Sequence, residues 1–198
     1  LAGNIMNKGG IALRLVNLAT ALTGRIPGSL AHTNTVANML FGSVSGSGTA
    51  AASAMGTIIA PFQKKQGYNE NFSSAVNIST APTGFLIPPS TTLITYGMAS
   101  GGTSIAALFI GGLIPGILWG LGCMIVIYFY AKKHGYIEKT TISFKEFIKV
   151  VLDALPSLLL VIIVIGGIFG GIFTATEGAG IAVGYPVSVS IVCYRSST

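Results

Sequence analysis

Apolar residues recur at helical spacing near the start of the chain, before its long uncharged stretches begin. Within residues 9–25, Ile11, Leu15, Leu18 and Leu22 lie three or four positions apart, with polar residues between them. This spacing puts the apolar side chains on one side of an α-helix. The pattern is typical of an amphipathic helix that lies along a membrane surface.

The next segment, residues 28–63, contains no Asp, Glu, Lys or Arg. It is longer than the roughly 20 residues that cross a bilayer, and it is too rich in Ser, Thr, Asn and Gly to face lipid. Basic residues flank it on both sides, which indicates that both of its ends lie on the same side of the membrane. We therefore predict a re-entrant helical hairpin. Its non-helical tip is tolerated only where protein or a cavity surrounds it.

Apolar stretches predict four membrane crossings after the hairpin. Residues 72–100 form a crossing that prolines interrupt, and residues 104–131 form the next one. A basic loop follows, and residues 151–194 contain two more crossings joined at "TATE" (174–177). With this topology every basic cluster lies on one side of the membrane, as the positive-inside rule describes.

Composition supports the membrane assignment and restricts the partners. Hydrophobic residues make up 51% of the 198 residues and charged residues 8%, whereas soluble domains carry about 25% charged residues. The net charge of +6 could suit nucleic acid, but the basic residues lie in short segments between apolar runs, so we expect no nucleic-acid partner. Cys123 and Cys193 lack metal or redox spacing and are expected to be buried, inert thiols.

The adjacent Pro88 and Pro89 are the first candidate for chemistry. Proline has no N–H, so the carbonyls of Gly84 and Phe85 lose their helical hydrogen-bond donors. Bare carbonyls are costly in an apolar interior, unless a cation lies against them. Transporters use such discontinuous helices to bind alkali cations and anionic substrates. A simple packing kink is the alternative, and the prolines leave both interpretations open.

The second candidate is "SVSGSGT" (43–49), at the expected turn of the hairpin. Gly46 and Gly48 permit positive φ angles and close backbone approach, and the neighbouring hydroxyl groups supply oxygen atoms. The alternative is helix packing, because small residues also form tight helix interfaces in membranes. The concentration of polar residues at the turn favours a binding site.

Other polar residues are expected to have structural roles. His32 has no Cys, Asp or second His nearby, so we expect a hydrogen-bonded core histidine rather than a metal ligand. Asp153 lies near a predicted membrane edge. Glu177 is expected to cap a helix start after Thr174 or Thr176, although an acid within a membrane can also be functional.

Enzymatic function is not supported by the motifs. The serines of "GSVSGSG" match neither G-x-S-x-G nor G-x-S-G, so an intramembrane serine hydrolase is disfavoured. The chain also lacks the phosphate-binding G-x-x-x-x-G-K-[ST] motif. We expect no catalytic residue and no cofactor.

Five stretches, in order, resemble the large membrane subunit of TRAP (tripartite ATP-independent periplasmic) transporters. They are "LAGNIMNKGGIALRLVNLA", "IPGSLAHTNTVANMLFGSVSGSGTAAASAMG", "GYNENFSSAVNIST", "GFLIPPSTTLITYG" and "GIFTATEGAG". The likeness runs from residue 1 to about 185. It implies an elevator-type, sodium-driven importer of a small organic acid (a C4-dicarboxylate, sialic acid or a sugar acid) in the bacterial inner membrane. It also implies two partners, a small four-helix membrane subunit and a periplasmic substrate-binding protein.

The resemblance places sodium at the first hairpin tip and at the broken helix, the two places that the residues themselves had indicated. We therefore predict a sodium site formed by Ser45, Gly46, Ser47, Gly48, Gly84, Phe85, Pro88, Pro89 and Ser90. The substrate is expected beside it, at Ser43, Thr49 and Thr91. Sodium acts as the coupling ion, and no other metal is expected.

The chain departs from the family pattern in its length. Family members are about twice as long and contain two inverted repeats, whereas this chain is expected to begin within an early transmembrane helix and to end early in the second repeat. Ala175 stands where the family has a proline, and Pro186 interrupts the final apolar segment. The alternative function is a truncated membrane fragment without transport activity.

Overall fold

The computed structural model describes residues 11–136, 143–172, 174 and 177, and the regular structure in these ranges is entirely helical. The all-α class predicted from the sequence is confirmed for this part of the chain. The helices, in chain order, are α2 (Ile11–Thr23), α3 (Ser29–Ser45), α4 (Gly48–Lys65), α5 (Glu70–Thr80), α6 (Thr83–Leu86), α7 (Thr91–Ala99), α8 (Ile105–His134) and α9 (Phe144–Phe169).

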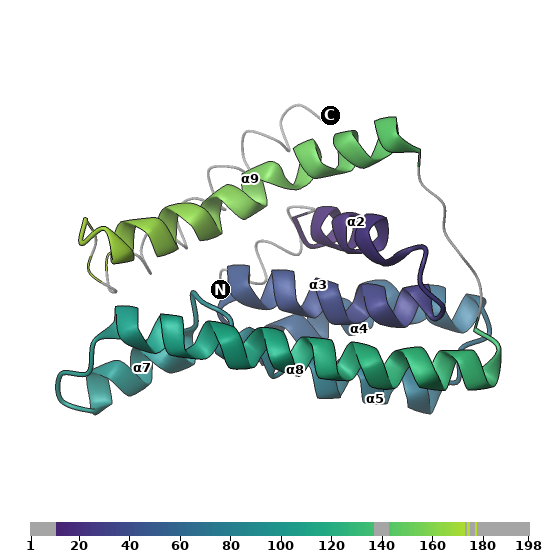
Figure 1. Ribbon diagram of the computed structural model, residues 1–198, viewed down its shortest axis with the longest axis horizontal. Coiled ribbons are helices and arrows are strands. Elements are labelled where there is room, and N and C mark those ends of the chain that lie inside the picture. The colour runs from purple at the N-terminus through teal and green to yellow at the C-terminus, as the bar shows by residue number, and fades with distance from the viewer. Residues whose placement is uncertain (1–10, 137–142, 173, 175–176, 178–198) are drawn as a thin grey trace.

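Helix α8 runs along the length of the molecule (Figure 1), and α3 is the helix that packs against most of the others. Helices α3 and α5 pack along α8, and α4 packs on both α3 and α5. Helix α2 lies between α3 and α9 and contacts both of them. The short α6 packs on α3 and α8, which brings the interrupted segment into the middle of the helical assembly.

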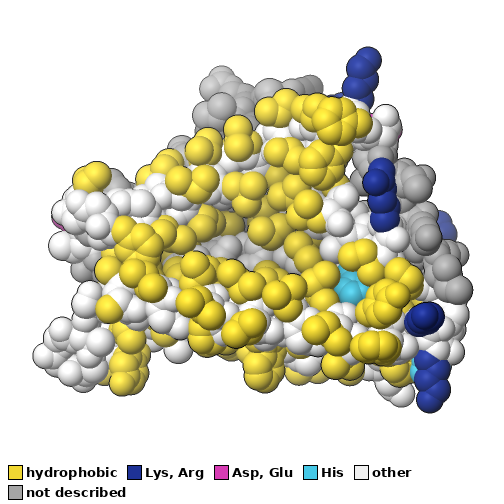
Figure 2. Space-filling model, viewed as in Figure 1, with side chains coloured by type: hydrophobic (Ala, Val, Ile, Leu, Met, Phe, Trp, Pro, Cys, Tyr) yellow, Lys and Arg dark blue, Asp and Glu magenta, His cyan; other side chains and the backbone are white. Residues whose placement is uncertain are grey.

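Two of the described helices, α8 and α9, are long and apolar enough to cross a bilayer. They contain 30 and 26 residues, or about 45 and 39 Å of helix, against a hydrocarbon core about 30 Å thick. Their exposed side chains include Ile114, Val126 and Ile162, and Figure 2 shows apolar side chains over much of the visible face. An apolar surface of this extent is consistent with a membrane protein.

Helix α9 begins earlier than the crossing predicted from residue 151. The Glu146 carboxylate accepts the Ser143 N–H at 3.0 Å, so the helix starts at Phe144 with a capped first turn. The crossing predicted in residues 178–194 lies outside the described residues.

Helix α2 is amphipathic, as its periodicity predicts, and its apolar side packs against protein. Of the four residues predicted to form that side, Ile11, Leu15 and Leu18 are buried, whereas Leu22, in the last turn, is exposed, contrary to the prediction. The buried side contacts α3 and α9. The location of this helix at a membrane surface stays a prediction.

Basic residues gather at one end of the molecule. Figure 2 shows the visible Lys and Arg side chains at the right-hand end, where α8 ends and α9 begins in Figure 1. Lys132 and Lys133 lie in the last turn of α8, and Lys64 and Lys65 lie in the last turn of α4. By the positive-inside rule, we expect this end to face the cytoplasm.

Glycines on one side of α8 bring it close to the end of α6 and to the residue that follows it. A Cβ on Gly112 would lie 2.5 Å from the Leu86 carbonyl oxygen, and one on Gly116 would lie 2.7 Å from the Ile87 side chain. The helix from Gly116 to Lys132 is about 24 Å long at about 1.5 Å per residue. The interruption after α6 therefore lies deep in the assembly, far from the basic end.

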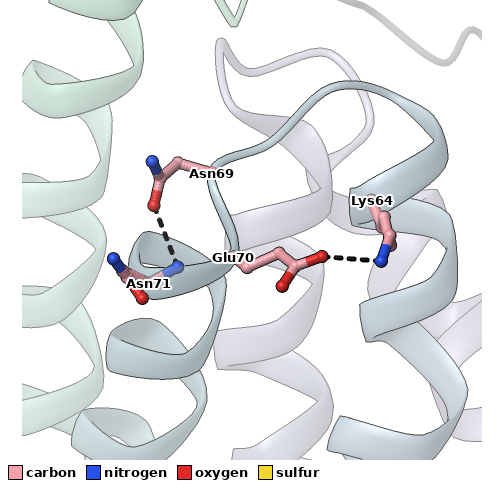
Figure 3. Close-up of polar contacts among 4 residues, drawn as sticks. All are labelled: Lys64, Asn69, Glu70 and Asn71. Carbon is pink, nitrogen blue, oxygen red and sulfur yellow. Dashed lines mark hydrogen bonds and ion pairs between the residues drawn. The ribbon is translucent and has the colours of Figure 1, made fainter.

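A polar turn between α4 and α5 holds the basic end of these helices together (Figure 3). The Asn69 side-chain oxygen accepts the backbone N–H groups of Asn71 at 2.9 Å and Phe72 at 3.2 Å, which caps α5. Lys64 and Glu70 form an ion pair of 2.7 Å, although both side chains are largely exposed. The hydrogen bond between them lowers the pKa of Glu70 and raises the pKa of Lys64.

Loss of the Asn69 cap is expected to matter more than loss of the ion pair. Asn69→Ala should destabilise the protein by about 1 kcal/mol, the usual cost of an N-cap. Glu70→Gln should leave stability near that of the parent, because water screens an exposed ion pair. Thermal unfolding in detergent at pH 7 compares the two variants, and a larger loss for Glu70→Gln would contradict this ranking.

The choice of pH 7 follows from the directions of the two pKa shifts. Because folding lowers the pKa of Glu70, its ionised carboxylate contributes to the free energy of unfolding at pH values above its unfolded pKa. This contribution is lost as the pH falls through the folded pKa. Because folding raises the pKa of Lys64, its ammonium group contributes to the free energy of unfolding at pH values below its unfolded pKa. This contribution is lost as the pH rises through the folded pKa. At pH 7 both contributions are present.

Candidate functional site

Four helix ends meet where the hairpin turns and where the proline segment interrupts the next helix. Helix α3 ends at Ser45 and α4 begins at Gly48, and these two ends form the hairpin tip. Gly46 has φ +65°, and its N–H donates to the Gly42 carbonyl at 2.7 Å, so it closes α3 in the left-handed conformation. Ser47 then caps α4 by accepting the Ala50 N–H. Of the two freedoms expected for the tip glycines, Gly46 uses the positive φ angle and Gly48 uses the close backbone approach.

The predicted 72–100 crossing contains two interruptions. Helix α5 ends at Thr80, and Thr83 Oγ1 donates to the Thr80 carbonyl at 2.7 Å across the turn at Pro82. The second interruption follows α6, where the backbone is extended at Ile87 and at Ser90. Ser90 begins α7 by accepting the Leu93 N–H at 3.3 Å.

The hairpin tip is hydrogen-bonded to the start of α7. The Gly46 carbonyl accepts the Thr91 N–H at 3.1 Å and the Thr91 hydroxyl at 2.7 Å. The C-terminal end of α3, which carries partial negative charge, therefore meets the N-terminal end of α7, which carries partial positive charge. This contact joins the two segments that the sequence indicated separately.

Three glycines allow the hairpin and α6 to touch backbone to backbone. A Cβ on Gly84 would lie 2.9 Å from the Gly42 Cα, 3.0 Å from the Gly48 Cα and 3.1 Å from the Gly48 nitrogen. A Cβ on Gly48 would in turn meet the Ala81 carbonyl oxygen and lie 2.7 Å from the Phe85 ring. Any side chain at these positions would force the two segments apart.

The carbonyl of Phe85 is not bare, contrary to the expectation from the sequence. The Ser90 hydroxyl donates to it at 2.6 Å and takes the place of the N–H that Pro89 lacks. Pro88 likewise has no N–H to offer the Gly84 carbonyl. Ser90 is fully buried, so its hydroxyl both covers a carbonyl of α6 and caps α7.

The structure brings most of the predicted sodium-site residues into one region. Gly48 adjoins Gly84 and Phe85, and Gly46 adjoins the Pro89 carbonyl oxygen. Hydroxyl groups surround the tip: Ser45 Oγ lies 3.3 Å from the Ser47 carbonyl, and Ser47 Oγ lies 3.0 Å from Thr49 Oγ1. The predicted residues in contact around the four ends are Ser45, Gly46, Ser47, Gly48, Gly84, Phe85, Pro89 and Ser90, with Pro88 buried between Ile87 and Pro89.

The three predicted substrate residues have different surroundings. Thr49 and Thr91 are exposed beside the hairpin tip. Ser43 is buried, and its hydroxyl donates to the Leu40 carbonyl of its own helix at 2.8 Å. The structure therefore places Thr49 and Thr91 at an accessible surface, but not Ser43.

The atoms of the site match a hard cation better than a transition metal. The polar atoms around the four helix ends are hydroxyl and carbonyl oxygens, which are the ligands that hard cations prefer. Within the described ranges no group of three or more His, Cys, Asp and Glu side chains could hold a metal ion. The N-terminal ends of α4 and α7 add partial positive charge, which suits an anionic group nearby.

The sequence analysis missed a set of buried and partly buried polar residues beneath the tip. Asn38 of α3 and Asn77 of α5 are hydrogen-bonded through their side chains at 3.1 Å, and Asn38 also reaches Thr80 at 2.8 Å. The signal that could have found them is the presence of asparagine within uncharged membrane segments, where polar side chains are expensive.

The remaining polar residues have the following surroundings. His32 is 1% exposed, as expected for a core residue, but neither ring nitrogen is within hydrogen-bonding geometry of a described residue. Glu177 accepts the N–H and the hydroxyl of Thr174, both at 2.8 Å, and its own N–H donates to Thr174 Oγ1, so the predicted capping contact is present. Cys123 is half-buried rather than buried. Cys193 lies outside the described residues.

The family model and the similar proteins reported below each match nearly the whole chain. Residues 1–198 match the family described as "Tripartite ATP-independent periplasmic transporter, DctM component". The chain is 56% identical to the uncharacterized protein YgiK of Salmonella typhimurium, over 98% of the chain and 45% of YgiK. It is 39% identical to the sialic acid TRAP transporter large permease protein SiaM of Vibrio cholerae, over 100% of the chain and 46% of SiaM. It is 41% identical to the ectoine TRAP transporter large permease protein TeaC of Halomonas elongata, over 99% of the chain and 46% of TeaC. The chain spans about half the length of the curated relatives it matches.

Proposed function

The chain belongs to the DctM component family of tripartite ATP-independent periplasmic transporters, and on that premise we propose that it takes part in sodium-coupled import of a small organic acid. The contact between the hairpin tip and the start of α7 carries this proposal. It joins two interrupted helices through the Gly46 carbonyl and Thr91, and discontinuous helices of this kind bind coupling ions in secondary transporters.

In the proposed mechanism, sodium binds among the oxygens of the four helix ends. The Gly46 and Phe85 carbonyls accept hydrogen bonds from Thr91 and Ser90, and an ion would compete for these same oxygens. By drawing them together, sodium would fix the hairpin tip against the segment between α6 and α7. The ordered tip would then offer a fixed surface to the substrate.

The proposed substrate carries an anionic group and lies beside Thr49 and Thr91. Both residues are exposed, and each lies at the start of a helix whose N-terminal end favours negative charge. Relatives of the chain are named for transport of sialic acid, C4-dicarboxylate, isethionate and ectoine. Ser43 would have to release the Leu40 carbonyl before it could contact the same substrate.

The proposed transporter acts in the bacterial inner membrane with two partners. A periplasmic binding protein would deliver the substrate, and a small four-helix membrane subunit would support the core as the site moves across the bilayer in an elevator motion. The basic end of the molecule would face the cytoplasm, so the hairpin would be re-entrant from that side.

Sodium binding can be tested without knowing the substrate. The protein in detergent is heated while sodium chloride replaces potassium chloride at constant total salt. A ligand that binds only the folded state raises its stability, so sodium should raise the unfolding temperature and potassium should not. Equal effects of the two salts would overturn the sodium site.

Transport is tested in vesicles that contain the chain with its binding protein and small membrane subunit. We expect uptake of sialic acid, succinate, isethionate or ectoine to require a sodium gradient. Sodium stabilisation together with uptake supports the proposal. Correct insertion without uptake of any of the four compounds would instead support the truncated, non-transporting alternative.

Three serine caps allow a matched test of the proposed site. Ser47 and Ser90 cap α4 and α7 at the site, and Ser104 caps α8 in the same way. Each Ser→Ala change removes a cap worth about 1 kcal/mol. Ser47→Ala and Ser90→Ala also remove an oxygen from the site, so each should raise the sodium concentration for half-maximal stabilisation about tenfold, near the lower range for a hydrogen bond to a charged group.

Ser104→Ala is the control, because it loses the same kind of cap elsewhere in the chain. It should lower the unfolding temperature without changing the sodium concentration that gives half of the stabilisation. If all three variants keep the parent sodium dependence, the assignment of Ser47 and Ser90 to the ion site is wrong.

A further inference from the structure

A buried amide lies between the hairpin and α5, outside the proposed ion site. The side-chain nitrogen of Asn38 is 3.1 Å from Asn34 Oδ1, 3.1 Å from Asn77 Oδ1, 3.4 Å from the Asn77 carbonyl oxygen and 2.8 Å from Thr80 Oγ1. Asn34, Asn38 and Thr80 are each at most 1% exposed. Four oxygens from two helices therefore surround one amide nitrogen.

This arrangement holds an amide and not an ion. The Asn38 nitrogen itself occupies the point on which the four oxygens converge, so no space is left there for a cation. The same four oxygens fix the orientation of the amide, because a flipped Asn38 side chain would place its own oxygen against them. The cost of that orientation is that Asn38 Oδ1 is buried without a hydrogen-bond partner among the described residues.

The network connects three helices. Asn38 lies on α3 and Asn77 on α5, and the Asn77 side-chain nitrogen donates to the Ala52 carbonyl of α4 at 2.8 Å. Both helices of the hairpin, α3 and α4, are thus hydrogen-bonded to α5, the helix that precedes the first interruption. Thr80, the last residue of α5, accepts from Asn38 and donates to the Val76 carbonyl at 2.7 Å.

The network lies one helical turn from the glycine contact at the site. Asn38 precedes Gly42 by one turn of α3, and Thr80 precedes the turn that leads to Gly84. Gly42 and Gly84 meet through their backbones without side chains that interlock. A smooth contact of this kind permits sliding, whereas hydrogen bonds are directional and specify one register.

We propose that Asn38, acting with Asn77 and Thr80, is a positioning group that sets the register between the hairpin and the broken helix. In this way it places the oxygens of the hairpin tip opposite those that follow α6. The inference rests on the proposed sodium site. It assigns no contact with the ion or the substrate to Asn38.

The test compares two threonines that make the same hydrogen bond within their own helices but have different surroundings. Thr80 and Thr57 each donate to the carbonyl four residues earlier, at 2.7 and 2.8 Å. Thr80 also accepts the Asn38 amide, whereas Thr57 is exposed. A Thr→Val change keeps the shape and removes the hydroxyl at either position.

The readout is a titration of the unfolding temperature with sodium chloride, at constant total salt, for the purified chain. Thr80→Val and Asn38→Leu are expected to raise the sodium concentration for half-maximal stabilisation about fivefold, the loss expected when roughly one neutral hydrogen bond no longer holds the site in register. Thr57→Val should keep the parent value. Thr80→Ser, which retains the hydroxyl, should restore most of the parent sodium dependence.

The outcomes separate this inference from the proposed function. If the parent protein responds equally to sodium and potassium, the sodium site itself is wrong. If the parent responds to sodium but Thr80→Val and Asn38→Leu only lower the unfolding temperature at every sodium concentration, the network is merely structural and the positioning role is wrong. A fivefold shift in both variants, with rescue by Thr80→Ser, supports it.

Discussion

Gly84→Ala is expected to lower sodium-driven uptake by about a hundredfold, since the crowding that it introduces costs up to about 3 kcal/mol and each 1.36 kcal/mol is about tenfold in rate. The new Cβ would lie 2.9 Å from the Gly42 Cα and 3.0 Å from the Gly48 Cα. Both are backbone atoms, so neither can move aside by changing a rotamer. The hairpin would have to move away from α6, and the proposed site would open.

A helical glycine elsewhere provides the control for Gly84→Ala. Gly111 of α8 has open space where its Cβ would be, so Gly111→Ala should retain uptake and should slightly stabilise its helix. Initial uptake rates in vesicles, corrected for the amount of inserted protein, measure the difference. Equal rates for the two variants would show that close approach of the hairpin and α6 is not needed for transport.

The location of the interruptions could be predicted from the sequence because their causes are local. A proline removes an N–H wherever it stands, so Pro88 and Pro89 marked the second interruption. Gly46 and its serine neighbours marked the hairpin turn because glycine accepts the left-handed conformation that the turn requires. The structure has an interruption at each of these places.

The partners of these residues could not be predicted, because they come from segments far apart in the chain. Ser90 covers the Phe85 carbonyl through a turn whose geometry depends on packing. Thr91 was expected beside the substrate, but its bonds to the Gly46 carbonyl depend on how the hairpin docks. Periodicity gives the faces of helices and does not specify which faces meet.

The Asn38 network shows a different limit of the sequence analysis. Asparagine in an uncharged segment signals a buried polar group, but it does not tell which other polar residue lies beside it. Asn38 lies 39 residues before Asn77 and 42 before Thr80, and each one alone resembles an ordinary polar residue in a helix. Their common role becomes visible only when α3 and α5 lie side by side.

Gly46→Ala is the second substitution with a large expected effect. Gly46 has φ +65°, a conformation that costs an L-residue about 1–2 kcal/mol. Its Cβ would also lie 3.0 Å from the Pro89 carbonyl oxygen and 3.1 Å from the Thr91 side chain. Crowding adds about 1–3 kcal/mol, so the Gly46 carbonyl should lose its alignment with the Thr91 N–H and hydroxyl.

Gly67→Ala separates the cost of the left-handed conformation from the cost of crowding, because Gly67 has φ +76° but open space around its Cβ position. Both variants should lose stability in thermal unfolding, and Gly46→Ala should lose about 1–3 kcal/mol more, the part that crowding contributes. Gly46→Ala should also lower uptake about thirtyfold, because about 2 kcal/mol of misalignment at the tip corresponds to that factor, whereas Gly67→Ala should transport like the parent. If Gly46→Ala loses no more stability than Gly67→Ala and retains uptake, the contact between the hairpin tip and α7 is not needed for transport, and the proposed ion site has to lie elsewhere in the protein.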